Sequence, residues 1–218
     1  KGGPLYVNGE NKLAREKARF GAILFSREGV GQYKVLLPKT SLDGTSFTLE
    51  KGEERIQVQS KLLGLHQVGP LAAAVHIAKQ IGLSNDEIER GVAHTIAFDH
   101  RLQRRDDEGG VIALDDSYNG NPDGVRAVIE FLASIENRRR WYVTPGLVEM
   151  GVRSEAIHRE IGRQLVMAGI EKVVLIKNSV TKWIEDGLTE NAFAGDIIWF
   201  DDARKCRSEE HTSELQSH

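Results

Sequence analysis

The hydrophobic pattern of residues 1–60 predicts a β-rich segment. Short apolar runs are bounded by glycine or proline, and later stretches alternate between apolar and polar positions, as in strands with one buried face. The segment 51–54 between the last two strands is expected to form a hairpin loop. The predicted strands span residues 22–25, 33–37, 45–49 and 55–59, with Phe47, Leu49, Ile56 and Val58 on one face.

The pattern changes to a helical period between residues 61 and 96. Residues 70–81 predict a helix, and Gly82 suits the position just after its end. Ser84 followed three residues later by Glu87 is a capping box, which predicts a second helix. The first helix carries Leu71, Ala74, Val75 and Ala78 at helical spacing together with His76, which is expected to be a packing or surface histidine, and the second carries Ile88 and Val92.

Strands alternate with amphipathic helices in the second half of the chain. The apolar run 111–114 predicts a buried strand that ends in Asp115 and Asp116. Asn121 is a good N-cap for the next helix, and Pro122 suits its first position. This alternation predicts an α/β fold with a Rossmann-like domain built on a parallel sheet. The further predicted elements are a helix at 122–134, a strand at 141–144, a helix capped by Ser154 with Ile157, Ile161 and Leu165 on one face, a strand at 172–176, a helix at 180–186 and a strand at 197–200.

Composition and charge exclude several classes of protein. The 218 residues are 40% hydrophobic, enough for one large core or two small ones, and the polar segment 97–110 predicts a domain boundary near its start. A net charge of -3 gives no electrostatic reason to expect binding to nucleic acid or to a membrane surface. The single cysteine, Cys206, excludes an internal disulfide and a cysteine-based zinc site. No apolar run approaches the ~18–20 residues that span a bilayer, so we expect a cytoplasmic protein.

The two ends of the chain and its missing motifs indicate a piece of a longer protein. Lys1 is not a methionine, and no phosphate-binding loop of the Gly-x-x-x-x-Gly-Lys-Ser/Thr type is present in the sequence. Residues 207–218 resemble the translation of a common sequencing-adapter oligonucleotide. We exclude this tail from reasoning about fold and function, together with its histidines His211 and His218.

The segment 115–122, Asp-Asp-Ser-Tyr-Asn-Gly-Asn-Pro, closely resembles the DDSYNANP signature of the Mur ligases, with Gly120 in place of the usual alanine. Three shorter matches occur in the order expected for that family. Residues 64–68 and 71–74 resemble its GxHNVxNALAA helix entry, Arg101-Leu102 resembles its GR element, and residues 143–151 with Ser154 and His158 are similar to VLGDMxELGxxSxxxHxxVG. The resemblance covers most of residues 20–200.

This resemblance implies a protein of three domains: a UDP-substrate domain, a central P-loop ATPase domain and a C-terminal Rossmann-like domain. Residues 1–96 would form the C-terminal part of the central domain, and residues 97–206 would form most of the C-terminal domain. The P-loop, the metal ligands and a carbamylated lysine would then lie upstream of Lys1.

The resemblance also implies a reaction. Members of the family use ATP, with Mg²⁺ as the expected metal, to convert a carboxylate into an acyl phosphate that an amine attacks. The match is closest to the branch that adds D-alanyl-D-alanine to UDP-N-acetylmuramoyl-tripeptide in peptidoglycan precursor synthesis, which implies a monomeric, ADP-forming ligase. We expect no ligase activity from this chain alone. Alternatives are another Mur-like ligase, of the cyanophycin-, folylpolyglutamate- or lipid-II-amidating type, or a non-catalytic nucleotide-binding module.

The resemblance assigns three residues to ATP. Asp116 would accept hydrogen bonds from the ribose hydroxyls, Arg101 would approach the phosphates, and His66 would lie beside the adenine. It assigns no catalytic residue and no metal ligand, and Glu149 and His158 match motif positions without an assigned role, although His158 is equally well explained as a helix-surface or packing histidine. Residues expected to organise the signature loop or to contact a substrate are Asp115, Ser117, Tyr118, Asn119 and Asn121, of which Asn121 is equally well explained by helix capping alone.

Three departures from the family pattern concern its substrates. Gln67 and Pro70 replace the two asparagines of the helix entry, which are linked to adenine recognition. The sequence Thr-Pro-Gly-Leu at 144–147 replaces LGDM, so that an acidic residue is lost at Gly146 or Leu147. These changes indicate a divergent branch whose amine acceptor could differ.

Overall fold

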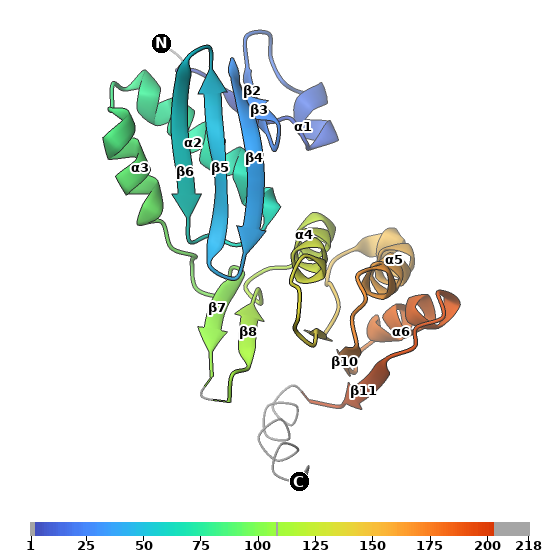
Figure 1. Cartoon of the computed structure of the whole chain (residues 1–218). Coiled ribbons are helices and arrows are strands. Elements are labelled where there is room, and N and C mark those ends of the chain that lie inside the picture. The colour runs from blue at the N-terminus through green and yellow to red at the C-terminus, as the bar shows by residue number, and fades with distance from the viewer. Residues whose placement is uncertain (1–2, 108, 203–218) are drawn as a thin grey trace. The chain divides into compact units, whose positions relative to one another are not determined.

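The computed structural model of the protein describes residues 3–107 and 109–202 (Figure 1). Its contacts divide the chain into two compact units, Lys1–Tyr118 and Asn119–His218. The mixed α/β fold expected from the sequence is confirmed. The expected domains 1–96 and 97–206 stay a prediction, and the adapter-like segment 207–218 lies outside the described residues.

The first unit contains a six-stranded sheet of β1 (Tyr6–Asn8), β2 (Ile23–Ser26), β3 (Gly29–Val30), β4 (Tyr33–Ser41), β5 (Gly44–Lys51) and β6 (Glu54–Ser60), in that order. β1 and β2 are parallel, whereas the other neighbours are antiparallel. The four predicted strands and the hairpin loop at 51–54 are confirmed, and the predicted apolar face is buried. The sequence pattern did not predict β1, β3 or the short helix α1 (Lys12–Glu16).

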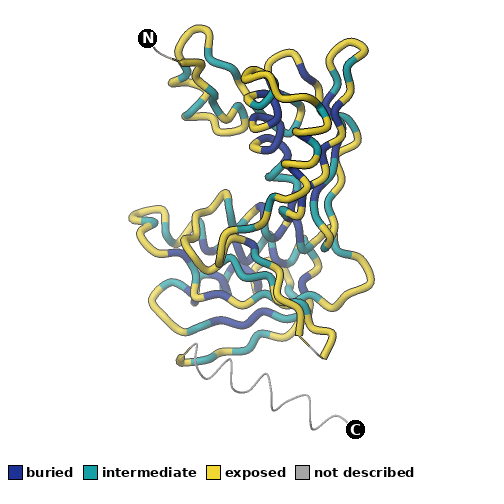
Figure 2. Tube along the Cα trace, turned by 90° about the vertical axis from the view of Figure 1, so that its left-hand side faces the viewer, coloured by how far each residue is buried: buried dark blue, intermediate teal, exposed yellow. Residues whose placement is uncertain are grey.

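Two helices pack on this sheet: α2 (Val68–Gln80), which follows a 3₁₀ turn at Leu65–Gln67, and α3 (Asn85–Ala93). The core of this unit is formed by buried residues of β3 to β6, α2 and α3, and buried stretches of the chain are dark blue in Figure 2. Ala74 was predicted on the buried face of α2 but is exposed. A helix turns by about 100° per residue, so position 74 lies well to one side of the stripe that faces the sheet. That stripe consists of Val68, Leu71, Ala72 and Val75.

Both predicted signals at the ends of these helices are confirmed. Gly82 has a φ of 93°, and the amide of Leu83 donates to the carbonyl of Ala78 at 3.1 Å, as in a Schellman motif. The Ser84 hydroxyl accepts from the Glu87 amide, and the Glu87 carboxylate accepts from the Ser84 amide. These local bonds make the α2–α3 connection short and well defined.

A cluster of polar side chains joins α2 to the sheet. Nδ1 of His76 lies 2.6 Å from the hydroxyl of Tyr6, and its buried ring meets the ring of Tyr33 edge-on. The Tyr33 hydroxyl donates to Glu54 at 2.5 Å, and Glu54 also pairs with Lys79 at 2.9 Å. Burial and the Glu54 carboxylate raise the pKa of Tyr33 to about 12. Burial lowers the pKa of His76, so folding favours its neutral form.

An antiparallel ribbon of β7 (Gln103–Asp106) and β8 (Ile112–Asp115) completes the first unit. Arg104 anchors the ribbon, because its guanidinium donates at 2.8 Å to the carbonyl of Leu42 in the β4–β5 turn. The prediction of a buried strand at 111–114 within the parallel sheet was wrong, since β8 is half-buried and pairs with β7. A four-residue apolar run has no period that reveals its partner, and the partner strand is polar throughout.

The second unit is a parallel sheet, in the order β11-β10-β9, packed against three helices. The predicted Rossmann-like alternation of strands and helices is confirmed here. The elements are α4 (Pro122–Ala133), β9 (Trp141–Thr144), α5 (Ser154–Met167), β10 (Lys172–Ile176), α6 (Thr181–Glu190) and β11 (Asp196–Phe200), with Ile129, Ile161, Leu165, Leu175 and Leu188 in the core.

Ser154 does not cap α5 as predicted. A 3₁₀ turn at Gly151–Arg153 runs directly into the helix, so that Arg153 is the cap residue and Ser154 already has a helical φ of -56°. The Ser154 hydroxyl instead lies 3.4 Å from Nδ1 of His158, one turn later.

α5 and α6 approach so closely that glycine is required at the contact. A Cβ on Gly187 would lie 2.2 Å from the carbonyl oxygen of Arg159, and one on Gly162 would lie 2.4 Å from the carbonyl oxygen of Ile184. The obstacles are backbone atoms, which cannot rotate away as a side chain can. The guanidinium of Arg159 links the same two helices by pairing with Glu155 on α5 and with Asp186 and Glu190 on α6.

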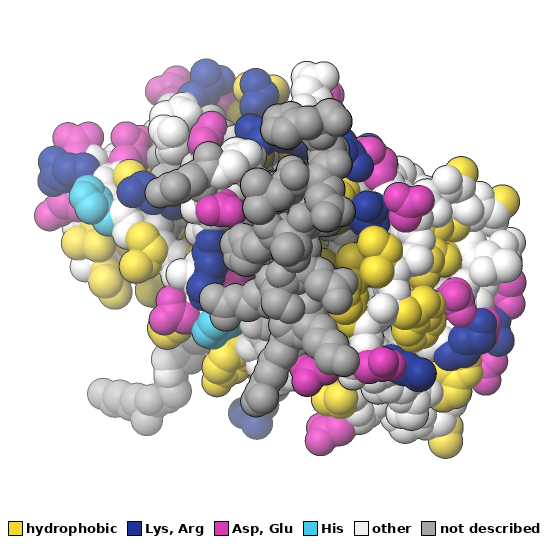
Figure 3. All heavy atoms as spheres, turned by 90° about the horizontal axis from the view of Figure 1, so that it is seen from below, with side chains coloured by type: hydrophobic (Ala, Val, Ile, Leu, Met, Phe, Trp, Pro, Cys, Tyr) yellow, Lys and Arg dark blue, Asp and Glu magenta, His cyan; other side chains and the backbone are white. Residues whose placement is uncertain are grey.

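The surface of the molecule carries charges of both signs. On the face shown in Figure 3, Lys and Arg side chains are interspersed with Asp and Glu, rather than gathered into a patch of one sign. Within residues 3–107 and 109–202, no helix is both long and apolar enough to cross a bilayer.

The His76 cluster makes stability depend on pH. The folded pKa of His76 lies below its unfolded value of 6.5, so the unfolded chain takes up a proton first. The stabilising contribution is complete above the unfolded pKa and is lost as the pH falls through 6.5 towards the lower folded pKa, by about 1.4 kcal/mol per unit of pKa difference. Urea unfolding at several pH values should show a smaller loss for His76→Gln than for the parent chain. Equal losses in both proteins would contradict this origin.

A glycine-to-alanine substitution should lower stability at the α5–α6 contact and raise it at an unobstructed helix position. Gly187→Ala should lower the free energy of unfolding by about 2–3 kcal/mol, because the added methyl group meets the Arg159 backbone. Gly91→Ala is the control, since Gly91 lies inside α3 with nothing within 4 Å of an added Cβ, and it should raise stability by about 0.5–1 kcal/mol. Denaturant unfolding measures both, and a Gly187→Ala variant as stable as the control would disprove the close approach.

Candidate functional site

The signature segment predicted from the sequence is divided between the two units. Asp115–Tyr118 closes the first unit, and Asn119–Pro122 opens the second. Each half is therefore held by contacts within its own unit.

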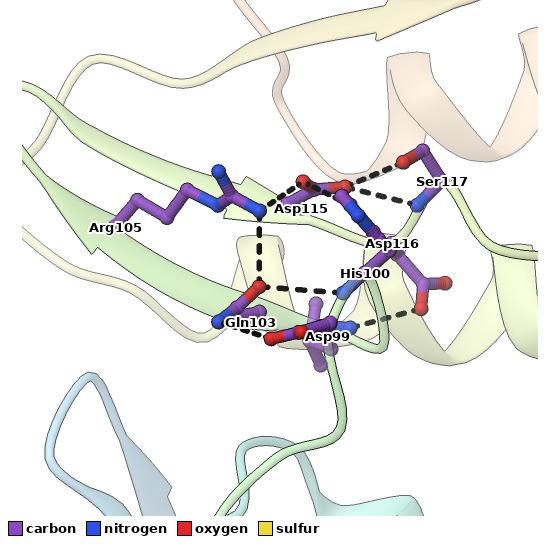
Figure 4. Close-up of polar contacts among 8 residues, drawn as sticks. Asp99, His100, Gln103, Arg105, Asp115, Asp116 and Ser117 are labelled. Carbon is purple, nitrogen blue, oxygen red and sulfur yellow. Dashed lines mark hydrogen bonds and ion pairs between the residues drawn. The ribbon is translucent and has the colours of Figure 1, made fainter.

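Asp115 ends β8 and is surrounded by hydrogen-bond donors (Figure 4). Its Oδ2 accepts from Nδ1 of His100 at 2.8 Å and lies 3.1 Å from the guanidinium of Arg105. Its Oδ1 accepts from the hydroxyl of Ser117 at 2.7 Å and from the Ser117 amide at 3.2 Å. Burial raises the pKa of Asp115, but the bonds from Ser117 and His100 outweigh it, so the net pKa is lowered. The ionised carboxylate holds the turn after β8 together.

Asp116, the next residue, has a different environment. Its Oδ1 accepts from the amide of Leu102 at 3.0 Å. Burial raises its pKa, and the charge of Asp115 adds to this, while the Leu102 bond and Arg101 oppose it only in part. Two neighbouring carboxylates thus have pKa values displaced in opposite directions, which is typical of functional sites. A carboxylate has about four acceptor positions, so a single backbone donor leaves Asp116 able to accept from a ligand.

Arg101 lies on the turn that supplies the Leu102 amide. Its guanidinium lies 4.5 Å from the centre of the Tyr118 ring, in a cation–π contact, and Tyr118 is exposed. The residues on either side, His100 and Leu102, have left-handed φ values of 61° and 46°. The Tyr118 amide donates to the carbonyl of His100 at 3.1 Å, which ties this turn to the signature segment.

His66 belongs to the same part of the first unit. Its ring folds over Gly64, where an added Cβ would lie 2.6 Å from ring atoms and 3.7 Å from Cδ2 of Leu102. Gly64 has a φ of 91° and is fixed by the Thr40 hydroxyl, which accepts from its amide at 2.9 Å. Since Asp116 accepts from the Leu102 amide, the structure brings the loops of all three predicted ATP-binding residues together.

Gln67 and Pro70, the departures in the helix entry, are both accounted for in the fold. The side-chain nitrogen Nε2 of Gln67 lies 3.0 Å from Nε2 of His66. Pro70 is the third residue of α2, where a missing N–H leaves no helical hydrogen bond unmade. The Gln67 side chain is therefore hydrogen-bonded to His66, and Pro70 has no polar side-chain group that could bind an adenine base.

Sequence reasoning missed His100, Gln103 and Arg105 as parts of this site. The Gln103 side chain accepts from the His100 amide at 3.3 Å and from Arg105 at 3.1 Å. These residues lie in the polar segment 97–110, which has no hydrophobic period to place them. The alternation of Gln103 and Arg105 could have indicated a polar strand whose side chains share one face.

The second half of the signature segment caps a helix. The Asn121 side chain accepts from the Gly124 amide at 2.9 Å, and Pro122 takes the first position of α4, as predicted. Asn119 is exposed. Capping therefore engages the carbonyl oxygen of Asn121 and leaves its NH₂ group as the donor.

Two departures from the family pattern, Gly120 in place of alanine and Leu147 in the altered segment 144–147, lie next to each other. A Cβ at Gly120 would lie 2.5 Å from Cδ2 of Leu147, which belongs to the hydrophobic core.

The Leu147 amide donates at 2.9 Å to Nε2 of His158, a fully buried residue of α5. Nδ1 of His158 donates to the Ser154 carbonyl at 2.6 Å, so this histidine is a neutral structural bridge.

A cavity of about 360 Å³ lies beside these residues, between the segments that follow β9 and β10. The carboxyl ends of parallel strands are where open α/β sheets bind ligands. Glu149, Ser154, Asn178 and Ser179 supply polar groups to its lining, and Leu147, Val148 and Met150 supply apolar ones. This composition suits a small ligand with both polar and apolar parts.

The described residues do not form a metal site. Within 3–107 and 109–202, no group of three or more His, Cys, Asp or Glu could hold a metal ion. The first unit offers a carboxylate, a guanidinium and an imidazole instead, which fit the ribose and phosphates of a nucleotide.

Comparison with protein families decides the identity. The family model described as "Mur ligase, glutamate ligase domain" matches residues 100–216, just over half of the chain. The chain belongs to the Mur ligase family. The resemblance carried by the signature segment is confirmed.

Curated relatives of this Mur ligase chain are named UDP-N-acetylmuramoyl-tripeptide–D-alanyl-D-alanine ligase. The protein from Mycobacterium tuberculosis strain H37Rv is 29% identical over 186 residues, covering 80% of this chain and 36% of the relative. That from Escherichia coli K12 is 32% identical over 133 residues, covering 61% and 29%. The chain thus spans about a third of the length of the curated relatives it matches.

Solved structures share the fold. MurF from Acinetobacter baumannii aligns with a TM-score of 0.74 at 21% identity, over 98% of this chain and 51% of that chain. MurF from Thermotoga maritima, whose structure is a complex with ADP, aligns with a TM-score of 0.69 at 20% identity, over 95% and 52%.

The contact between Gly120 and Leu147 predicts non-additive substitutions. Gly120→Ala should lower the free energy of unfolding by about 1–2 kcal/mol, because Leu147 must leave its buried position. In a Leu147→Ala background the same change should cost close to nothing, since the obstructing methyl group is gone. Equilibrium unfolding of both single variants and the double variant measures the coupling, and additive effects would show that the two residues do not interfere.

Proposed function

We propose that this chain is part of an ATP-dependent, ADP-forming ligase that adds D-alanyl-D-alanine to UDP-N-acetylmuramoyl-tripeptide in peptidoglycan precursor synthesis. The observation that carries the proposal is the signature segment, in which Asp116 accepts from the Leu102 amide beside Arg101. Relatives named for this reaction support it. On this proposal the protein is cytoplasmic and monomeric and binds neither nucleic acid nor membranes.

The first unit would bind the nucleotide. Asp116, with acceptor positions to spare, would take the ribose hydroxyls, and Arg101 would face the phosphates as a fixed cation. His66 would lie beside the adenine, without the two asparagines replaced by Gln67 and Pro70. ATP supplies the phosphoryl group that activates the carboxylate. The ligands of Mg²⁺ would lie in a part of the protein outside residues 1–218.

The second unit would receive the amine. The cavity after β9 and β10 has the size and mixed lining of a small-ligand site, and Asn119 and the NH₂ group of Asn121 stand on the loop that leads into α4. Holding the amine in a fixed position next to a reactive acyl phosphate, away from water, is the main contribution such a site can make.

A second candidate is a Mur-like ligase with a different amine acceptor. It is favoured by Leu147, which occupies the motif region where the family has an acidic residue and which lines the cavity. An apolar group there would alter which amine fits.

The function can be tested on the complete protein from which this segment derives. ADP release should require both the UDP-linked tripeptide and D-alanyl-D-alanine, and Asp116→Asn should raise KM for ATP by about tenfold or more, through the lost ribose contact. Asp123→Asn is the matched control, because that exposed carboxylate pairs only with exposed Arg126 among the described residues, and its effect should stay within about twofold.

Other outcomes discriminate between the alternatives. Turnover with another amine but not with the dipeptide would replace the acceptor and retain the ligase reaction. Absence of any ATP-dependent turnover would favour a non-catalytic nucleotide-binding module. Residues 1–206 alone should form no amide bond, and detectable ligation by them would contradict the proposed division of the active site.

A further inference from the structure

His100 is held in one orientation by a carboxylate. Its Nδ1 lies 2.8 Å from Oδ2 of Asp115, and because an ionised carboxylate only accepts, Nδ1 carries the proton. Asp115 is itself fixed by Ser117 and Arg105 (Figure 4). The imidazole therefore cannot turn without breaking a charge-assisted hydrogen bond.

The backbone at His100 is held in a conformation that favours glycine. Its φ is 61°, a left-handed value that is uncommon for a residue with a Cβ. Its amide donates to the Gln103 side chain at 3.3 Å, and its carbonyl accepts from the Tyr118 amide at 3.1 Å. A side chain kept at a position where glycine would be easier is typical of functional sites.

The second ring nitrogen of His100 is available to a ligand. The His100 side chain is 48% exposed, and within residues 3–107 and 109–202 the hydrogen bonds of its ring are made through Nδ1. His100 is adjacent to Arg101 in the chain, and its partner Asp115 is adjacent to Asp116. His100 is thus joined through Asp115 to the turn that carries Asp116, and it precedes Arg101; these are the two residues to which the proposed function assigns the ribose and the phosphates.

We propose that His100 is a further nucleotide-binding residue of this site and that Asp115 is its positioning residue. The proposal rests on the proposed function, because it requires a nucleotide bound by Asp116 and Arg101. Nε2 would hydrogen-bond to the ribose–phosphate part of the nucleotide, where it can serve as donor or acceptor. Asp115 then has a function beyond holding the turn, since it selects the ring nitrogen that faces the ligand.

Two substitutions separate this role from a structural one. Asn adopts left-handed backbone readily and can still donate to Asp115, so His100→Asn should keep the thermal midpoint of the chain while removing Nε2. His100→Gly removes the whole ring and places glycine, which adopts left-handed φ values without strain, at this position. Both variants should bind ATP about three- to tenfold more weakly than the parent, as expected for one lost hydrogen bond.

The measurement is a titration of the isotope-labelled complete protein, from which this segment derives, with ATP, ADP and adenosine, followed by NMR. A loss of affinity for ATP and ADP but not for adenosine places Nε2 at the phosphates, and an equal loss for adenosine places it at the ribose. Asn137→Gly is the control, because exposed Asn137 in the second unit also has a left-handed φ, of 57°, and should leave ATP affinity unchanged.

The outcomes distinguish this inference from the proposed function. If Asp116→Asn weakens ATP binding while both His100 variants retain parental affinity, the role of His100 is wrong and the nucleotide site stands. If neither Asp116→Asn nor the His100 variants change the affinity of the complete protein, or if the complete protein shows no ATP-dependent shifts, the proposed nucleotide site is wrong and this inference falls with it.

Discussion

The first unit depends on two consecutive carboxylates that leave the same strand and meet opposite environments. Asp115 collects donors from three side chains and stays ionised, whereas Asp116 is more buried and receives one backbone amide. Placing two like charges one residue apart is unfavourable unless donors compensate at least one of them. The turns that carry His100 and Leu102 supply one donor to each carboxylate, and both residues have a left-handed backbone.

In the cores of both units, buried histidines link neighbouring elements by hydrogen bonds. His76 joins α2 to β1 through Tyr6, and His158 joins α5 to the segment after β9 through the Leu147 amide. A neutral imidazole has one donor and one acceptor on opposite sides of a flat ring, so it can link two elements without carrying charge into the core. In the second unit this link fixes the backbone of Leu147, which lines the cavity.

Most of the fold could be predicted from local signals. The alternation around Phe47 and Ile56, the capping box at Ser84 and the Asn121-Pro122 helix start depend on neighbouring residues alone, and all are confirmed. What could not be predicted depends on distant partners. The polar strand Gln103–Asp106 gave no sign that it pairs with β8, and the preceding 3₁₀ turn removed the need for a cap at Ser154. For the candidate site, the resemblance supplied His66, Arg101 and Asp116, whereas His100 and Arg105 became visible only through their contacts with Asp115.

The division of the signature segment at Tyr118 and Asn119 has a consequence for how such proteins diversify. A genetic crossover at this peptide bond would exchange the capped helix, the Leu147 contact and the cavity as one inherited block. The carboxylates and the turns that support them would remain with the other parent. Eight consecutive residues of the sequence therefore belong to two compact units that such a crossover would separate.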